Sequence, residues 1–142
     1  MIRIVIDTNL FISALLKPGS NPDMILRSVK SENVLLLMSV AICHEISRVL
    51  TYPKIRKRLT ASDQELEDFV NLLSSVAIIT PGTLDLPFLD ADPDDTKYLV
   101  CAVEGHADYI VSGDHHLTDL VIYRGIRIVT PVDFLQILSC SG

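Results

Sequence analysis

The fold of this chain is decided by its first strand and the turn after it, Ile2-Arg3-Ile4-Val5-Ile6-Asp7-Thr8-Asn9-Leu10-Phe11-Ile12-Ser13-Ala14-Leu15-Leu16. The β-branched run Ile4-Val5-Ile6 predicts a strand that is buried on both faces. The strand stops at a carboxylate, Asp7, and the apolar residues Leu10–Leu16 predict a helix. Open α/β sheets bind their ligands at the carboxyl ends of such strands. Asp7 is therefore either a site residue or only the N-cap of the following helix.

Composition and charge limit the class of protein. The chain has 142 residues, enough for one domain, and 49% of them are hydrophobic, which excludes a disordered chain. No apolar run is long enough to span a bilayer, and the chain begins directly with a strand, so we expect no signal peptide. The net charge of −6 is unusual for a general nucleic-acid binder but fits carboxylates gathered around cations. The cysteines Cys43, Cys101 and Cys140 lack metal or redox spacing, which fits a reducing cytoplasm.

Strand and helix patterns alternate along the whole chain. After the first strand, further strands are predicted at Val34–Met38, Val76–Ile79, Tyr109–Val111 and Ile126–Val129. The intervening segments have the apolar spacing and the caps of helices: Asn21–Val29, Val40–Leu50 after the cap Ser39, a helix capped by Ser62 or Asp63, one from Asp92 to Glu104, His115–Leu120 and Val132–Leu138. This alternation predicts an α/β fold with a mostly parallel sheet of about five strands and helices on both faces.

Two acidic residues fall on helix faces that we expect to be buried. Glu45 lies beside the apolar stripe of its helix, and Asp95 lies four residues before Leu99 on the inner face of another. A carboxylate in such a position needs a partner. Each residue also has an ordinary alternative. Glu45 can reach water from the edge of the stripe, and Asp95 can complement the helix dipole together with Asp92 and Asp94.

A further acid, Asp114, directly follows the strand Tyr109–Val111. Parallel strands end at the same edge of a sheet, so Asp114 is expected near Asp7, although Ser112-Gly113-Asp114 is also ordinary turn chemistry. Like-charged carboxylates about 4 Å apart repel by roughly 4 kcal/mol per pair at an effective dielectric constant of about 20. Gathered acids therefore require either protonation or a hard divalent cation, for which oxygen-only ligands suit Mg²⁺ or Mn²⁺. The pair His115-His116 is expected in an exposed loop, with substrate contact as the alternative.

The order of these motifs resembles that of PIN-domain nucleases. The resemblance covers essentially the whole chain and is carried by Asp7-Thr8-Asn9, Glu45, Asp95 within Asp92-Pro93-Asp94-Asp95-Thr96-Lys97-Tyr98-Leu99, and Asp114 after Ser112-Gly113. It is greatest to the single-domain members of VapC type, the toxin components of toxin–antitoxin pairs. It implies one PIN-like domain over residues 1–142, a three-layer sandwich, with a disordered tail in the last few residues.

The resemblance also implies an activity and a set of roles. The activity is hydrolysis of RNA phosphodiester bonds by water activated by Mg²⁺ or Mn²⁺. The proposed metal ligands and catalytic residues are Asp7, Glu45, Asp95 and Asp114, and the supporting residues are Thr8, Asn9 and Ser112. Many VapC-type members carry a basic residue before the last acid, where this chain has Gly113, so no phosphate contact is expected from that position.

Partners follow partly from the residues and partly from the resemblance. The dense basic cluster of Lys54, Arg56, Lys57 and Arg58 is a candidate RNA-binding surface that would hold flanking phosphates; its alternative is a solvated helix end. The family suggests a small antitoxin protein and a homodimer. Two other classes of function stay open: a catalytically degenerate module that binds RNA or protein, and phosphotransfer through Asp7, which would usually need an acid where this chain has Asn9.

Overall fold

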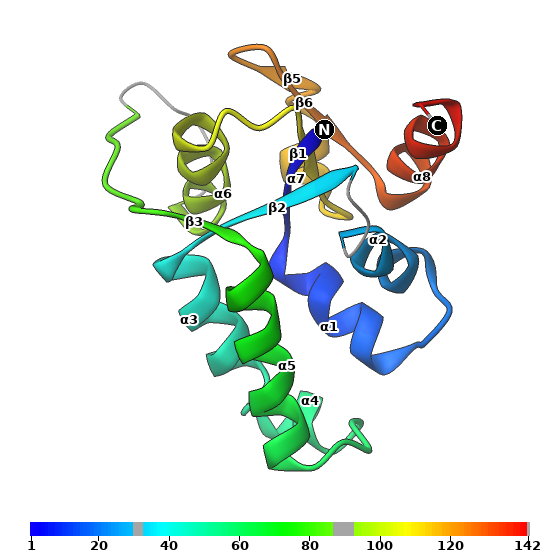
Figure 1. Cartoon of the computed structure of the whole chain (residues 1–142). Helices are drawn as coiled ribbons and strands as arrows, with labels where there is room; N and C mark the ends of the chain where they lie inside the picture. The colour runs from blue at the N-terminus through cyan, green and yellow to red at the C-terminus, as the bar shows by residue number, and fades with distance from the viewer. Residues whose placement is uncertain (30–32, 87–92, 142) are drawn as a thin grey trace.

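A single sheet of six strands runs through the residues described in this computed structural model, which are 1–29, 33–86 and 93–141 (Figure 1). The strands are β1 (Ile2–Ile6), β2 (Val34–Ser39), β3 (Ile78–Thr80), β4 (Tyr109–Val111), β5 (Ile122–Tyr123) and β6 (Ile126–Val129). Their order is β3-β2-β1-β4-β6-β5, and every pairing is parallel except that of β5 with β6. The mostly parallel sheet predicted from the alternation is confirmed.

Helices cover both faces of this sheet. They are α1 (Thr8–Leu16), α2 (Asn21–Val29), α3 (Val40–Val49), α4 (Pro53–Arg56), α5 (Asp63–Val76), α6 (Pro93–Glu104), α7 (His115–Thr118) and α8 (Pro131–Ser141). Helix α6 packs on β1, β2 and β4, whereas α2 packs on β2 and against α8. In Figure 1, α6 lies on one side of the strands and α2 and α8 lie on the other, which gives the expected three layers. Within the described ranges, no helix has the length and apolar character needed to cross a membrane.

The strand β5 was not predicted, and its turn explains why. Arg124 and Gly125 join β5 to β6 with φ angles of 49° and 82°, the left-handed pair of a type I′ hairpin turn. Arginine is not a residue that usually signals this turn. The strand Ile122–Tyr123 also has only two residues, which is too short for an alternation of apolar and polar residues to be recognised.

The chain end differs from its prediction as well. The last helix, expected to end at Leu138 and to be followed by a disordered tail, continues to Ser141, and Gly142 lies outside the described residues. Phe134 anchors it, because this side chain is fully buried and its ring lies 5.8 Å from the ring of Tyr109 in an edge-to-face contact. Packing of α8 on α2 extends the helix beyond its own apolar pattern.

The position of α6 over the sheet depends on close packing at its end. Leu99, Cys101 and Ala102 on its inner face are completely buried. After the helix, Gly105 passes so close to β2 that an added Cβ would lie 2.6 Å from Leu37 Cδ1. A larger residue there would have to displace the buried side chain of Leu37, so a glycine suits this position at the end of α6, which carries Asp95.

The sheet reverses its strand order between β1 and β4. The chain leaves β1 for β2 on one side and returns, after β3 and α6, to β4 on the other side of β1. The register pairs Ile6 with Val111, so the residues that follow, Asp7 and Ser112, come side by side at the carboxyl edge. Open α/β sheets place their ligand sites at such a reversal.

Candidate active site

A polar pocket of about 340 Å³ lies at this carboxyl edge. It is lined by Asp7, Asn9, Glu45, Arg48, Val49, Tyr52, Asp95, Lys97, Tyr98, Asp114 and His116. The four acids singled out in the sequence are all among them. They come from the ends of β1 and β4, from α3 and from α6, so segments far apart in the chain contribute to one cavity.

Asp7 is held by neutral hydrogen-bond donors on both oxygens. The Ser112 hydroxyl donates to Asp7 Oδ2 at 2.8 Å, and the Asn9 backbone N–H donates to Asp7 Oδ1 at 3.2 Å. The Asp7 side chain is almost completely buried, and its backbone N–H continues the ladder by donating to the Val111 carbonyl at 3.0 Å. Asp7 is thus the N-cap of α1 and a pocket residue at once, so the two interpretations of its sequence position do not exclude each other.

Asp114 has the same double position at the end of β4. Its carboxylate caps the short helix α7 by accepting the backbone N–H of His116 at 2.9 Å. Its own N–H donates to the Ser112 hydroxyl at 3.0 Å. Ser112, which is completely buried, therefore connects Asp114 to Asp7 through one oxygen atom. The supporting role that the resemblance implies for Ser112 stays a prediction, to which the structure adds these two hydrogen bonds.

Asp95 enters the pocket from the first turn of α6. Its side chain is buried, with 9% of the residue surface exposed, as expected for the inner face of the helix. The nearby acid Asp92 lies outside the described residues, and the side chain of Asp94 is not described either, so the first-turn alternative for these two residues stays a prediction.

Glu45 has charged and hydrogen-bonding partners on both of its oxygens. The Tyr98 hydroxyl donates to Glu45 Oε1 at 2.5 Å, and Lys97 Nζ forms an ion pair with Glu45 Oε2. The same hydroxyl lies 2.9 Å from Thr8 Oγ1 and accepts the backbone N–H of Thr8 at 3.2 Å. Tyr98 therefore joins the start of α1 to Glu45 on α3, and Thr8 contributes to the site through this network.

These contacts set the protonation of the network. Burial on its own raises the pKa of Glu45. Lys97 and the hydroxyls of Thr8 and Tyr98 together lower it by more, so the net pKa lies below its usual value. Burial, the charge of Asp7 and the bond to Glu45 raise the pKa of Tyr98 far above its usual value. At neutral pH Glu45 is a carboxylate and Tyr98 is a neutral donor.

Five polar pocket residues were missed or only partly foreseen from the sequence: Arg48, Tyr52, Lys97, Tyr98 and His116. Tyr98 was interpreted as an inner-face residue of its helix, which is correct, since only 3% of it is exposed. Its hydroxyl was the usable signal, because a buried tyrosine almost always needs a polar partner. His116 lines the pocket, and the alternative of substrate contact by one residue of His115-His116 stays a prediction.

The pocket residues offer the ligand chemistry of a hard cation. Carboxylate oxygens without histidine or cysteine pairing suit Mg²⁺ or Mn²⁺. Among residues 1–29, 33–86 and 93–141, however, no group of three or more His, Cys, Asp or Glu side chains is arranged so that it could hold a metal ion. In the same pocket Glu45 forms an ion pair with Lys97. The carboxylate oxygens of the pocket are thus chemically suited to a divalent ion, and the pocket also contains an ammonium group, that of Lys97.

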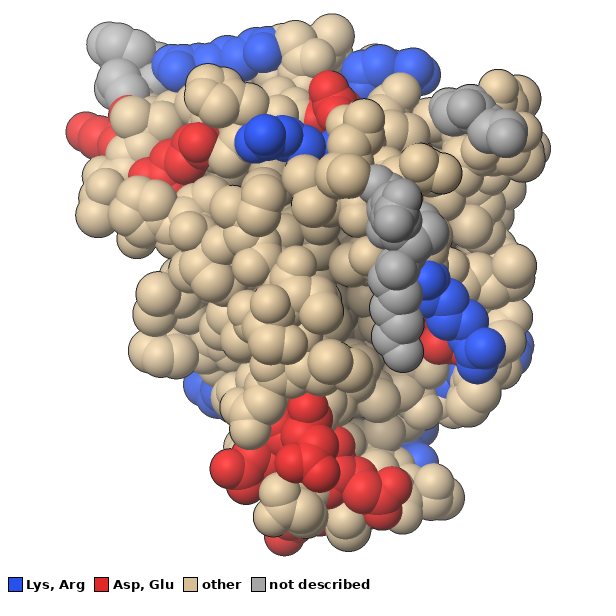
Figure 2. Space-filling model, viewed as in Figure 1, with Lys and Arg blue, Asp and Glu red and all other residues tan. Residues whose placement is uncertain are grey.

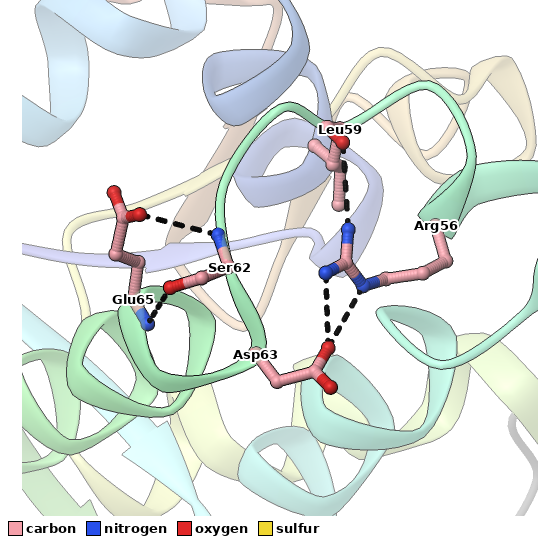
Figure 3. A network of polar contacts seen from close by, with 5 residues as sticks. All are labelled: Arg56, Leu59, Ser62, Asp63 and Glu65. Atoms are coloured by element: carbon pink, nitrogen blue, oxygen red, sulfur yellow. Dashed lines mark hydrogen bonds and ion pairs between the residues drawn. The ribbon is translucent and has the colours of Figure 1, made fainter.

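The basic cluster is at and beyond α4, close to the pocket residues Arg48 and Tyr52 but not within the pocket. Its members do not act alike. Arg56 Nε and Nη2 donate to Asp63 Oδ1 at 3.0 and 2.9 Å, and Arg56 Nη1 lies 3.4 Å from the Leu59 carbonyl (Figure 3). Lys54, Lys57 and Arg58 are exposed.

The surface next to the basic cluster is acidic. Figure 2 shows Asp and Glu side chains gathered at the end of the molecule where Figure 1 places the beginning of α5. This helix begins with the exposed acids Asp63, Glu65, Glu67 and Asp68. Two of them have structural roles, since Asp63 holds Arg56 and Glu65 completes a capping box with Ser62 (Figure 3). The cap of α5 is thus Ser62, one of the two residues predicted.

Comparisons with known proteins agree with this architecture. The chain is 32% identical to an uncharacterized protein of Methanocaldococcus jannaschii, MJ1680, over 143 aligned positions that cover 95% of this chain and 90% of that protein. It is similar in structure to a chain of VapBC2 from Rickettsia felis, solved with a DNA fragment from their promoter, with a TM-score of 0.61, 14% identity and coverage of 91% and 98% of the two chains. The family model described as PIN domain matches residues 3–116, which contain every pocket residue named above. The chain therefore belongs to the PIN domain family, whose members are generally nucleases.

Proposed function

We propose that this protein is a Mg²⁺- or Mn²⁺-dependent endoribonuclease that hydrolyses RNA at the pocket lined by Asp7, Glu45, Asp95 and Asp114. The convergence of these acids on one polar cavity is the observation that supports the proposal. PIN nucleases typically use divalent metals, which is a further reason to expect a cation among these oxygens. A bound ion would supply an activated water and neutralise the charge that develops on the scissile phosphate.

The residues of this chain have separate tasks in the proposed reaction. Asp7, Asp95 and Asp114 would present oxygens to the ion, and Glu45 would be the fourth ligand. Ser112 and the Asn9 backbone N–H fix the orientation of the Asp7 carboxylate, which is the task of an outer-shell donor. Thr8 and Tyr98 do the same for Glu45. Arg48 and His116 line the same pocket, where a phosphate would find cationic or hydrogen-bonding partners.

The RNA strand would continue from the pocket toward α4. Arg48 and Tyr52 line the cavity, and the next residues along the chain are the basic cluster of Lys54, Arg56, Lys57 and Arg58. Lys54, Lys57 and Arg58 are exposed and can meet flanking phosphates, whereas Arg56 would first have to leave Asp63. We therefore assign the larger share of phosphate contact to the three exposed residues.

Partners are also part of the proposal. The structural neighbour belongs to VapBC2, which supports a toxin role for this chain and a small antitoxin protein as its partner. A protein partner would explain the apolar groove between α2 and α5, which is lined by Phe69, Leu72 and Val76; Leu72 is 49% exposed and Val76 is 43% exposed. The homodimer expected from the family resemblance stays a prediction, which light scattering would test.

The test of the catalytic proposal is cleavage of a labelled single-stranded RNA in Mg²⁺ or Mn²⁺. We expect cleavage by the wild type, none in EDTA, and a rate at least about 10²-fold lower for Asp7→Asn, the loss expected when a charge-stabilising group is removed. Asp133→Asn, which changes an exposed acid on α8, is the matched control and should cleave normally.

Two results would contradict this proposal. If the wild type binds RNA but never cuts it in either metal, the degenerate binding module becomes the better description. Cleavage that continues in EDTA would instead remove the metal from the mechanism.

A further inference from the structure

Lys97 is the only lysine among the residues that line the pocket, and its position is unusual. It lies on α6 two residues after Asp95, and its Nζ pairs with Glu45 Oε2. Only 18% of its side chain and 16% of that of Glu45 are exposed. Lysines near a surface normally extend their ammonium group into water. This one turns its charge inward, so the surrounding carboxylates must compensate for the hydration that it loses.

Both oxygens of Glu45 are already engaged. Oε1 accepts the hydrogen bond of Tyr98, and Oε2 is paired with Lys97. Lys97 Nζ also lies 5.0 Å from the centre of the Tyr98 ring, over its face, where an ammonium group is attracted. Three groups therefore hold one another in place, and a second cation cannot approach Glu45 without meeting the charge of Lys97.

Asp7 gives the contrast within the same pocket. Its oxygens accept hydrogen bonds from a hydroxyl and a backbone N–H, both of which are neutral. Neutral donors orient a metal ligand without repelling the metal. The cationic partner of Glu45 orients its carboxylate and also opposes a nearby cation. A metal ion would therefore meet neutral hydrogen-bond donors at Asp7 and a competing positive charge at Glu45.

We propose that Lys97 is the built-in cation of this pocket: it neutralises Glu45 in the metal-free protein, and a divalent ion binds there in competition with it. The inference rests on the proposed metal-dependent function and adds a regulatory element to it. Loading of the pocket requires Lys97 to release Glu45. Lys97 thus stabilises the metal-free protein and raises the metal concentration at which the pocket fills.

The first test is a calorimetric titration of metal-free protein with MnCl₂. Lys97→Met keeps much of the side-chain length and removes the charge, and Lys17→Met makes the same change at an exposed lysine after α1. We expect Lys97→Met to bind Mn²⁺ about tenfold tighter than the wild type, since a unit charge a few ångströms from the ion is removed. We also expect its melting temperature in EDTA to fall by roughly 3–8 °C. Lys17→Met should match the wild type in both measurements.

A second test uses the wild type only, so it does not depend on how well the variant folds. Brief acetylation with an amine-reactive ester, followed by peptide mass spectrometry, reports how accessible each lysine amine is. We expect Lys97 to be labelled severalfold faster with saturating Mn²⁺ than in EDTA, because the ion displaces it from Glu45. Lys17 should be labelled equally in both.

The outcomes separate this inference from the proposed function. Equal Mn²⁺ affinity of the wild type and Lys97→Met, or labelling of Lys97 that Mn²⁺ does not change, overturns the role of Lys97 while the metal site stands. A wild type and a variant that both fail to bind Mn²⁺ overturn the metal-dependent function, and the competition with it.

Discussion

Two carboxylate–cation pairs, Lys97–Glu45 in the pocket and Arg56–Asp63 at the beginning of α5, have the same chemistry in different surroundings. In the pocket pair, 18% of the lysine side chain and 16% of the glutamate side chain are exposed. In the other pair, 32% of the arginine and 94% of the aspartate are exposed, and the contact between Arg56 Nη2 and Asp63 Oδ1 is 2.9 Å (Figure 3). Arg56 donates two hydrogen bonds to one oxygen of Asp63, and water reaches the Asp63 carboxylate freely.

The difference in exposure indicates which of the two pairs is retained for function and not for stability. An exposed pair contributes about 0–1 kcal/mol, because water and salt screen it. A partly buried pair loses hydration on both sides, and replacing it with apolar residues is often neutral or stabilising. The chain therefore gains little stability from Lys97–Glu45 compared with an apolar pair, although removal of Lys97 alone would leave Glu45 uncompensated. A role in the chemistry of the site explains the presence of the pair better.

The largest effect on stability that we expect comes from Tyr98→Phe, which removes the hydroxyl that organises the pocket pair. Its loss leaves the buried backbone N–H of Thr8 without its acceptor and Glu45 without its donor. An unsatisfied buried donor costs about 1–3 kcal/mol. Urea unfolding at pH 7 should show a loss of this size, and a melting temperature lower by roughly 3–10 °C.

Tyr52→Phe is the matched control, since Tyr52 lines the same pocket but is 44% exposed. We expect it to change the free energy of unfolding by less than about 0.5 kcal/mol. If Tyr98→Phe cost no more than this control, the pocket would not be organised through the Tyr98 hydroxyl, and the contrast with the exposed pair would weaken.

Glu104 is a third carboxylate to compare with these two pairs, and its partners are neutral. Its carboxylate accepts the backbone N–H groups of Gly82, Thr83 and Leu84 at 2.7, 3.0 and 3.1 Å. Burial is the largest single contribution and raises its pKa, but the hydrogen bonds together lower it by more, so the folded-state pKa lies below the usual value of 4.5. The charged form is thus favoured by folding, and its contribution is complete above about pH 4.5 and disappears as the pH falls through the lower folded-state value.

We therefore expect Glu104→Gln to destabilise the protein by about 1 kcal/mol at pH 7, where the anion accepts all three N–H groups. The difference from the wild type should shrink between about pH 5 and pH 3, as the wild-type carboxyl gains its proton. Urea unfolding at several pH values measures this, with the exposed Glu67→Gln as control. A difference that is constant from pH 7 to pH 3 would show that the charge of Glu104 has no part in holding the loop.

The same contrast explains how much of the site the sequence could reveal. The period of the apolar residues places Glu45 and Asp95 on inner helix faces, and parallel strands bring Asp7 and Asp114 to one edge. The four acids of the pocket therefore follow from local patterns and topology. The strands Tyr109–Val111 and Ile126–Val129 were predicted with the bounds that the structure has. These features depend on spacing along the chain.

Pairing across the fold does not depend on spacing, and there the sequence was insufficient. Nothing in the pattern of α6 distinguishes Lys97 from a solvated lysine, because its partner Glu45 is 52 positions away and meets it only after α3 and α6 pack together. The basic cluster also looked uniform, although Arg56 pairs with Asp63 across the turn between α4 and α5 and its neighbours are exposed. A carboxylate on an inner face can be recognised from sequence; the cation that compensates it requires the tertiary structure.

The smallest effect is expected for Arg56→Ala, which breaks the exposed pair. Since 94% of the Asp63 side chain is in contact with solvent, we expect a loss of about 0.5 kcal/mol in low salt and almost none in 1 M NaCl, where the screening length is only about 3 Å. Lys57→Ala, at an exposed neighbour, should change the stability little in either salt. In contrast, the destabilisation of metal-free Lys97→Met should persist in 1 M NaCl, because ions in solution screen a partly buried pair much less. A loss for Arg56→Ala that equalled that of Lys97→Met and resisted salt would mean that exposure does not separate the two pairs, and that neither pair is marked as functional by its surroundings.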